Sequence, residues 1–309
     1  MQESTPDTAI LTESSSITDA ILHGRTSRKR RRTAAILQKA NVSHARLLRY
    51  NQCGYGAWIM RSVANEQKYK ILANRCHDRF CPTCNRIKSG LLAQRLSKCM
   101  ELDGVRFVTL TLLRSSDGLK KQIDRIYKYY AKLRRWKAWS CTQTASISFL
   151  ETKFNFKAKQ WHTHLHILTQ GTFLPQKELS NKWKYITGDS YIVDIRAIKS
   201  KTEAVNYVTK YASKGVSMSA LGDDQAAIEA IHALSGRRLI ISTGNWKQIE
   251  KQDEREEKAE WTPVCSLAKM IERAMNQEPE AIEIINLLLL RKGGKGTCIY
   301  MKHFASESG

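Results

Sequence analysis

A row of histidines with a period of two constrains the fold more than any other feature of this chain. Residues 161–168 run Trp-His-Thr-His-Leu-His-Ile-Leu. Successive side chains of an extended strand alternate between its faces, so His162, His164 and His166 project to one side while the residues between them pack on the other. Imidazole is the commonest protein ligand of transition metals. The pattern therefore predicts a β-strand that carries a metal-binding face.

A second pattern has the period of a helix. From Glu203 to Lys214 the chain runs Glu-Ala-Val-Asn-Tyr-Val-Thr-Lys-Tyr-Ala-Ser-Lys. Positions four apart share a helix face, so Glu203, Tyr207 and Tyr211 form one stripe, and Lys210 and Lys214 each follow a tyrosine by three residues. Tyrosines at this spacing are most often packing residues. Beside a metal, however, a phenol is a nucleophile toward phosphorus, and a neighbouring lysine stabilises the developing charge. Tyr207 is the first choice as nucleophile.

The charge of the chain indicates the class of partner. Lys and Arg number 51 and Asp and Glu 29, which gives a net charge of +22. Such an excess is typical of proteins that bind a polyanion, with nucleic acid as the default; a ribosome-associated or merely soluble basic protein is the alternative. A basic block predicts phosphate contacts, although a solvated tail explains it equally well. Its residues are Arg28, Lys29, Arg30, Arg31 and Arg32.

The cysteines predict a metal centre rather than disulfides. The N-terminus has neither the basic nor the apolar region of an export signal, and no apolar run is long enough to span a membrane. We therefore expect a cytoplasmic location, without membrane partners, where thiols stay reduced. Cys81-Pro-Thr-Cys84 has the spacing at which two thiolates bind one zinc ion, and Cys76 and Cys53 complete a tetrahedral set. His77 is an alternative ligand, and a cluster of buried thiols is the alternative to zinc.

The order of predicted elements indicates an α+β fold. It is strand 105–112, helix 117–138, strand 145–156, the histidine strand, helix 175–186, strand 190–196 and the tyrosine helix. This β-α-β-β-α-β-α order predicts a central antiparallel sheet with helices packed on one face. Glu151 lies on the strand before the histidines and can supply an oxygen ligand to the same metal as His162, His164 and His166. Such a set of nitrogen and oxygen ligands suits catalytic Mg²⁺ or Mn²⁺.

Four regions follow from these patterns. They are a flexible basic tail over 1–45, a zinc-binding unit with a hairpin and a helix over 46–104, a catalytic domain over 105–215, and a mostly helical, charged region over 216–309. The last region carries no chemistry that the sequence alone identifies.

Taken together, the motifs resemble a known superfamily. The strand Phe107-Val-Thr-Leu-Thr-Leu112, the His164-Leu165-His166 strand and the Tyr-x-x-Lys helix resemble the three ordered motifs of HUH endonucleases. The motif Cys76-x-x-Arg79-x-Cys81-Pro-x-Cys84 ahead of them resembles rolling-circle replication initiators of small bacterial plasmids. The resemblance covers roughly residues 50–245.

The resemblance implies an enzyme that nicks one strand at a plasmid double-strand origin, where the DNA is single-stranded at the nick. A divalent metal on the histidine pair and a tyrosine that keeps the 5′ phosphate perform the cut, and the freed 3′-OH primes the host polymerase beside a host helicase. In one family variant a glutamate four residues before the tyrosine ends the cycle, as Glu203 would. In the other a second tyrosine does so, as Tyr211 would. Arg79 joins the candidate DNA-binding residues.

Three alternatives stay open at this point. A single-strand transposase and a conjugative relaxase share the same active site. A zinc-containing DNA-binding regulator would bind without cutting. The oligomeric state is not predicted.

Overall fold

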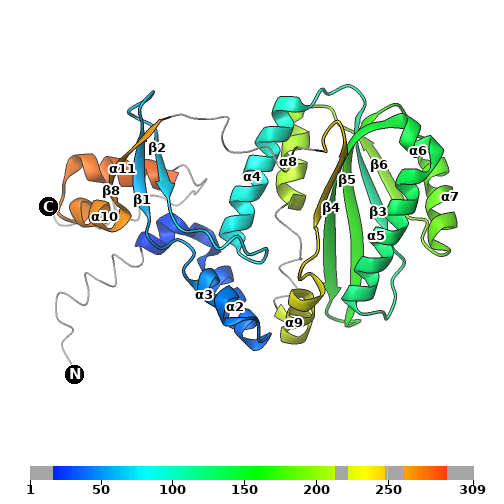
Figure 1. Ribbon diagram of the computed structural model, residues 1–309, viewed down its shortest axis with the longest axis horizontal. Coiled ribbons are helices and arrows are strands. Elements are labelled where there is room, and N and C mark those ends of the chain that lie inside the picture. Colours follow the sequence, from blue (N-terminus) through cyan, green and yellow to red (C-terminus); the bar gives the residue numbers. More distant parts are fainter. Residues whose placement is uncertain (1–16, 213–221, 248, 250–259, 291–309) are drawn as a thin grey trace. The chain divides into compact units, whose positions relative to one another are not determined.

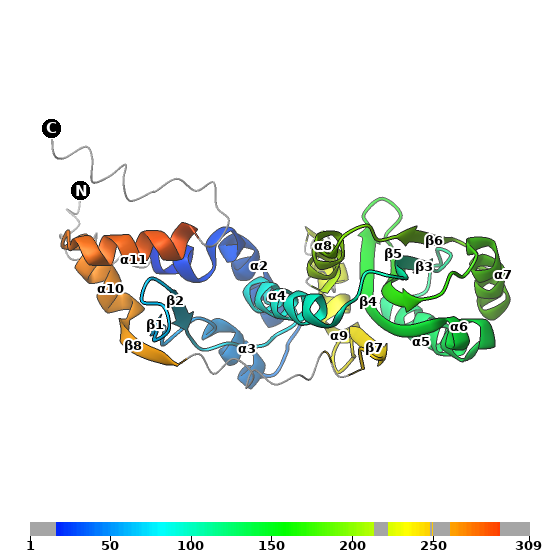
Figure 2. The ribbon, with the colours of Figure 1, turned by 90° about the horizontal axis from the view of Figure 1, so that it is seen from above.

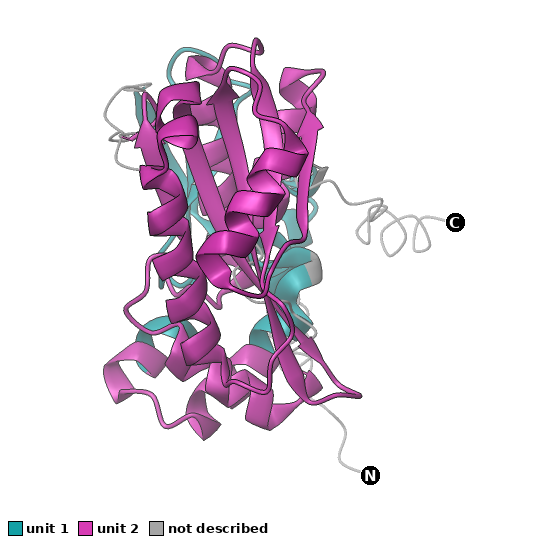
Figure 3. Ribbon diagram, turned by 90° about the vertical axis from the view of Figure 1, so that its right-hand side faces the viewer, with its two compact units in different colours: residues 1–31, 48–76, 254–309 teal, residues 32–47, 77–253 magenta. Residues whose placement is uncertain are grey.

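The computed structural model describes residues 17–212, 222–247, 249 and 260–290. The chain divides into two compact units, coloured separately in Figure 3. Unit 1 comprises residues 1–31, 48–76 and 254–309, and unit 2 comprises residues 32–47 and 77–253. Each unit is built on an antiparallel sheet of its own. The α+β class expected from the sequence is therefore confirmed.

Unit 2 holds a five-stranded sheet in the order β6-β3-β5-β4-β7. Its strands are β3 (Val105–Thr111), β4 (Gln143–Asn155), β5 (Gln160–Gly171), β6 (Val193–Ala197) and β7 (Ile240–Gly244). β4 and β5 form a long hairpin, and β5 is the central strand of the sheet. The histidine row thus lies in the middle of the sheet rather than at an edge.

Helices cover both faces of this sheet (Figures 1 and 2). One face carries α5 (Leu119–Arg135), α6 (Lys137–Thr142) and α7 (Gln176–Thr187), and the other carries α4 (Pro82–Cys99) and α8 (Lys201–Ala212). The expectation of helices on one face was wrong. β4 and β5 are buried along most of their length, so both sides of the strands must be shielded from water.

Helix α9 connects two other elements of unit 2 through one carboxylate. α9 (Asp224–Ala233) begins at Asp223, whose side chain accepts from the backbone N–H of Ala226. From α9, Glu229 accepts hydrogen bonds from the Leu119 N–H at 2.7 Å and from the Trp161 indole at 2.6 Å. This carboxylate therefore fixes the start of α5 against the start of β5.

Unit 1 holds a three-stranded sheet in the order β2-β1-β8. The predicted hairpin is confirmed as β1 (Trp58–Ser62) and β2 (Tyr69–Leu72). β8 (Trp261–Ser266) joins the free side of β1 from far along the chain. α10 (Leu267–Met275) and α11 (Pro279–Leu290) complete the apolar core that encloses Ile59.

The structure divides the chain differently from the four expected regions. Part of the expected tail is helical: η1 (Gly24–Thr26) and α2 (Ser27–Lys39) precede α3 (His44–Asn51). The expected helical C-terminal region also supplies β7 and β8, one to each sheet. Such short strands gain stability from partners distant in sequence, which local periodicity does not show. None of the described helices has the length and apolarity needed to cross a bilayer.

Candidate active site and metal centre

β5 presents its histidines to the face that α8 covers. His166 is 6% exposed, and Leu165 and Ile167, which point the other way, are fully buried. Also on that other face, the Thr163 hydroxyl donates to the side-chain oxygen of Gln122 on α5 at 3.1 Å. The alternation predicted from the sequence is therefore present.

Two threonines of β3 fix the rings of two histidines. β3 pairs with β5 so that Thr111 lies opposite His164 and Thr109 opposite His166. Each threonine hydroxyl is 3.2 Å from the Nδ1 atom of its histidine. A hydrogen bond at one imidazole nitrogen fixes the tautomer and the direction of the other. Both rings therefore keep Nε2 for the interior of the site.

The third histidine is used differently. His162 Nε2 lies 3.2 Å from the backbone carbonyl oxygen of Leu112, and its ring contacts that of His164 with centroids 4.1 Å apart. Burial lowers the pKa of His162, and this backbone hydrogen bond partly opposes the shift. The Nε2 atom of His162 is thus engaged with the backbone, while its ring stays in contact with that of His164.

Glu151 on β4 reaches the same face. It lies opposite His164 in the β4–β5 register and is 3% exposed. Its Oε2 atom is 2.8 Å from His166 Nε2 and 3.5 Å from Lys153 Nζ. With Nε2 of His166 donating to the carboxylate, Nδ1 accepts from the Thr109 hydroxyl. A buried carboxylate is thereby placed against the histidine pair.

His164 carries an unsatisfied atom at the centre of the row. Its Nε2 is buried and has no hydrogen-bond partner. Burial, followed by the charges of His162, His166 and Lys153, lowers the pKa of His164 to about 3. The ring is therefore neutral near pH 7, which is the form that binds metals. Two imidazole nitrogens and a carboxylate are ligand types that suit a divalent metal, and the buried Nε2 of His164 lacks a partner, but the ligand atoms of His164, His166 and Glu151 do not all lie within 4.8 Å of one another in this structure.

The tyrosines of α8 meet the histidine row ring to ring. Tyr211 stacks on His166 with centroids 3.8 Å apart, and the Tyr207 ring lies 6.2 Å from that of His166. Tyr207 itself stacks on Phe107 of β3 at 3.5 Å. Two patterns about 40 residues apart thus converge on one spot between sheet and helix.

The Tyr207 phenol is held out of water. Its hydroxyl is buried and makes no hydrogen bond of ordinary geometry. Burial raises the pKa of Tyr207, the neighbouring Tyr211 raises it further, and the approach of the Thr109 hydroxyl opposes the shift only in part. The phenol is therefore protonated and shielded in this state.

The remaining candidates of the stripe lie outside this contact. Glu203 is exposed, accepts from the Lys199 N–H at 2.9 Å, and its own N–H donates to the Ser200 hydroxyl at 3.1 Å. It thus caps the start of α8. Lys210 is exposed, with Nζ 4.9 Å from the centre of the Tyr211 ring. Lys214 lies outside the described residues.

Sequence reasoning missed Thr109, Thr111 and Lys153. All three lie on the face of the histidines: the threonines pair with them across β3 and β5, and Lys153 lies opposite His162 across β4 and β5. Thr109 and Thr111 alternate within a predicted strand, so the period of two was a usable signal. The register between β3 and β5, which places each threonine opposite a histidine, cannot be read from either strand alone.

The four predicted zinc ligands come together. Their sulfur atoms all lie within 4.8 Å of one another, and among the described residues this is the one such convergence of cysteine, histidine or acidic side chains. The group is Cys53, Cys76, Cys81 and Cys84. Cys53, Cys81 and Cys84 are buried. Four converging thiols could hold a metal ion.

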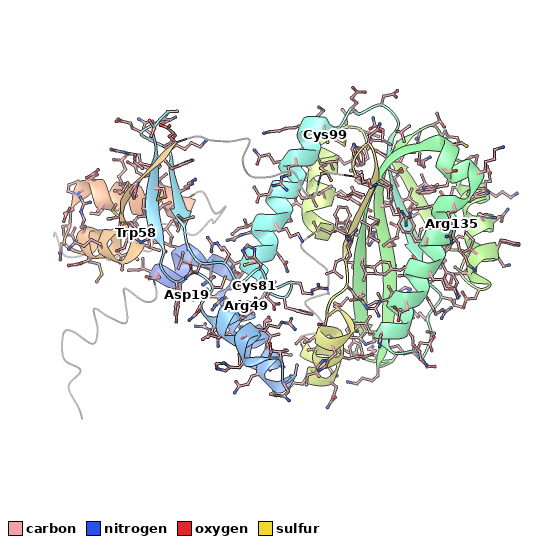
Figure 4. The ribbon with its side chains drawn as sticks, in the orientation of Figure 1. Asp19, Arg49, Trp58, Cys81, Cys99 and Arg135 are labelled. Atoms are coloured by element: carbon pink, nitrogen blue, oxygen red, sulfur yellow. The ribbon has the colours of Figure 1, made fainter. Side chains whose placement is uncertain are left out.

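The start of α4 positions two of the four cysteines, Cys81 and Cys84. Cys81 is the residue before the helix, Pro82 is its first residue, and Cys84 follows in the same turn (Cys81 is labelled in Figure 4). The positive end of a helix favours thiolate over thiol. His77, the alternative ligand, is exposed and lies outside the group.

The basic block is partly engaged in the fold. Arg30 donates to three carbonyl oxygens around the end of α3, those of Tyr50, Asn51 and Cys53. Arg32 pairs with Asp224. The side chains of Arg28, Lys29, Arg31 and Arg32 are exposed.

Arg79 is likewise turned inward. Its guanidinium donates to the Leu234 carbonyl, and burial lowers its pKa. The side chain joins the cysteine loop to the end of α9, so its visible contact is structural.

Comparison with known proteins gives a family. The family model described as "Replication protein" matches residues 68–286. Two curated relatives, each named "Protein rep", are 26% identical to the chain. The one from Staphylococcus aureus aligns over 173 residues, which is 50% of this chain and 75% of the relative. The one from Lactiplantibacillus plantarum aligns over 209 residues, 58% of this chain and 66% of the relative. No solved structure matches.

Proposed function

The chain belongs to the replication protein family, and from that premise we propose that it starts rolling-circle replication by nicking and rejoining one strand at a plasmid double-strand origin. Family membership confirms the resemblance to plasmid replication initiators. The contact between His166 and the two tyrosines supports the nicking chemistry most directly.

Tyr207 is the proposed nucleophile. Its phenolic oxygen bonds to the scissile phosphorus, the 3′-oxygen leaves as the 3′-OH, and the 5′ phosphate stays on the tyrosine. The phosphotyrosine keeps the energy of the broken bond, so a later attack by a 3′-OH rejoins the strand without ATP. Until DNA arrives, burial keeps the phenol protonated and out of reach of water.

His164, His166 and Glu151 are the proposed holders of Mg²⁺ or Mn²⁺. An ion held by these residues would polarise the scissile phosphate and stabilise its developing negative charge. The threonines on Nδ1 keep both imidazoles directed into the site. Lys153, beside the Glu151 carboxylate, can stabilise negative charge there.

The closing cleavage has two candidates. Tyr211 is favoured by its stack on His166, whereas the Glu203 carboxylate is exposed and engaged in capping α8. Replacing Tyr211 by Phe and Glu203 by Gln separates them. The variant that lacks the closing residue should still make the initial nick but should fail to release the finished strand.

We assign Zn²⁺ to the cysteine group. An all-thiolate tetrahedral set is typical of structural zinc, and it would join the loop after α3 to the start of α4. The partners of the initiator are the origin DNA, a host helicase and a host polymerase, with DNA contacts expected from the exposed Arg28, Lys29 and Arg31.

The deciding experiment maps the DNA end that becomes attached to protein. Supercoiled plasmid bearing a double-strand origin is incubated with the chain and Mn²⁺ or Mg²⁺. We expect a single nick with protein on the 5′ end, and no adduct from Tyr207→Phe. Tyr185→Phe, on an exposed tyrosine of α7, is the control. Adducts from Tyr207→Phe at the wild-type level would move the role to Tyr211, and full origin binding without nicking would indicate a non-cutting regulator.

A further inference from the structure

The helices α10 and α11 pack on one face of the three-stranded sheet of unit 1, and the other face carries exposed side chains. In the register of β1 and β2, Ile59 lies opposite Ile71, and both pack into the core with α10 and α11. The residues that alternate with them therefore point to the opposite, outer face. Trp58 lies opposite Leu72, and they are 46% and 59% exposed.

The outer face combines aromatic and cationic side chains. Trp58 and Met60 on β1, Lys68 and Lys70 at β2, Leu72, and Trp261 on β8 share it by register. No carboxylate falls among these six side chains; the nearest acidic residues along the chain, Glu66 and Glu260, are in the turn between β1 and β2 and just before β8.

The two lysines are positioned by an indole. Lys70 Nζ lies 4.1 Å from the centre of the Trp261 ring, and Lys68 Nζ lies 5.9 Å from it. A cation over an indole is held without a hydrogen bond, so its N–H groups remain able to donate to a ligand. Trp58, on the same face, exposes nearly half of its surface. A large exposed apolar side chain beside ordered cations is the composition of a nucleic-acid surface rather than of a solvated face.

We propose that this outer face binds single-stranded DNA, with a base stacked on Trp58 and phosphates held by Lys68 and Lys70. Charge complementarity selects a polyanion, and stacking selects unpaired bases, because a paired base does not offer its ring to a side chain that lies on a strand. The proposed nicking activity, on which this source of ligand rests, exposes such a strand. The site is separate from the histidine row and lies wholly within unit 1.

The test measures binding without chemistry. The full chain carrying Tyr207→Phe is titrated, without divalent metal, into a fluorescent 20-nucleotide oligothymidine. Adding Trp58→Ala should lower the affinity by about tenfold, the effect of losing one stacked base, and leave the salt dependence unchanged. Lys68→Ala with Lys70→Ala should instead reduce the slope of log K against log salt by about 1.4, since each phosphate contact to a single strand contributes about 0.7. Tyr185→Ala, which removes an 81% exposed tyrosine from α7, is the matched control and should change neither.

Two results would overturn the inference. One is wild-type affinity of Trp58→Ala for oligothymidine; the other is an equal loss for a duplex of the same length, which would indicate contacts to the backbone alone. Thermal melting checks each variant, and Leu72→Glu, which places a negative charge on the same face, decides the question if Trp58→Ala unfolds. Plasmid nicking is scored separately. The nicking assay uses the chain that keeps Tyr207. If that chain does not nick while Trp58→Ala loses oligothymidine binding, the proposed function is rejected and this surface is kept. If that chain nicks while Trp58→Ala binds with wild-type affinity, this surface is rejected and the proposed function is kept.

Discussion

The two sheets of this chain differ in how much of each is covered. Helices pack on both faces of the five-stranded sheet, whereas α10 and α11 pack on the inner face of the three-stranded sheet and Trp58 is left half exposed on the outer one. Each sheet has a face with polar side chains: the histidine row on the five-stranded sheet, which it shares with an apolar cluster that includes Phe107 and Leu168, and the two lysines on the three-stranded sheet. In one, that chemistry is enclosed against α8; in the other, it faces solvent. Enclosure suits a reaction that must exclude water, and exposure suits a surface that must meet a long ligand.

The enclosed sheet retains costly groups. His164 Nε2 and the Tyr207 hydroxyl are buried without the hydrogen bonds that such atoms normally make. Each costs roughly 1–3 kcal/mol of stability. Both atoms lie between the five-stranded sheet and α8, and buried polar atoms without a partner can mark a catalytic site. The predictions below test this contrast.

The largest expected effect concerns the enclosed face. Replacing His164 and His166 by Ala should lower metal-dependent nicking by at least about a thousandfold, because the metal and its stabilisation of charge are lost together. Oligothymidine binding by the three-stranded sheet should be unchanged. Plasmid relaxation with and without EDTA measures the first quantity and anisotropy the second. Nicking that survives EDTA would defeat the metal assignment.

The next effect concerns the cysteine centre, which belongs to neither sheet. Cys81→Ser should reduce bound zinc from about one ion per chain to well below one and lower the free energy of unfolding by about 4 kcal/mol. Elemental analysis and thermal melting measure the two changes. Cys99→Ser, at an exposed cysteine outside the group, is the control. Unchanged zinc content in Cys81→Ser would mean that the thiols pack without a metal.

A matched leucine pair compares the sheets directly. Leu165 is fully buried on β5. Leu165→Ala leaves a cavity there and should lower the free energy of unfolding by about 3 kcal/mol. Leu72, 59% exposed on β2, should cost no more than about 0.5 kcal/mol when changed to Ala. Urea unfolding monitored by circular dichroism provides both values. Equal losses would show that the outer face of the three-stranded sheet is covered after all.

The smallest expected effect has the opposite sign. Tyr207→Phe removes a buried hydroxyl that lacks a hydrogen bond and should raise the free energy of unfolding by about 1 kcal/mol while ending adduct formation. Tyr130 is the control: its buried hydroxyl lies 3.4 Å from that of Ser146, so Tyr130→Phe should lower stability by about 1 kcal/mol. A less stable Tyr207→Phe would mean that the phenol is satisfied in the free protein.

Local periodicity predicted the middle of the chain well. The predicted order β-α-β-β-α-β-α is present between residues 105 and 212, with the short helix α6 as an unpredicted addition after α5, and the alternation of β5 places His164 and His166 on one face. Period two and period four are imposed by neighbouring residues, so they are visible in the sequence. The meeting of imidazoles and phenols needed only the further step of packing α8 on that face.

Pairing over long distances was not predictable in this way. β8 joins β1 across about 200 residues, and nothing within Trp261–Ser266 indicates its partner. Glu203 makes a structural contact that the sequence pattern contains: Ser200-Lys-Thr-Glu203 has the spacing of a capping box at the start of α8. Arg30 lay within a charged run whose local composition concealed its three backbone contacts.

The pairing of β8 with β1 also determines the order in which the two sheets can form during synthesis. The hairpin of β1 and β2 leaves the ribosome early, but its third strand begins only at Trp261, after every strand of the five-stranded sheet has emerged. Unit 2 can therefore finish folding while β1 still presents an unpaired edge, open to chaperones or to another copy of itself. The β1–β2 hairpin precedes the five-stranded sheet along the chain but is completed only after that sheet.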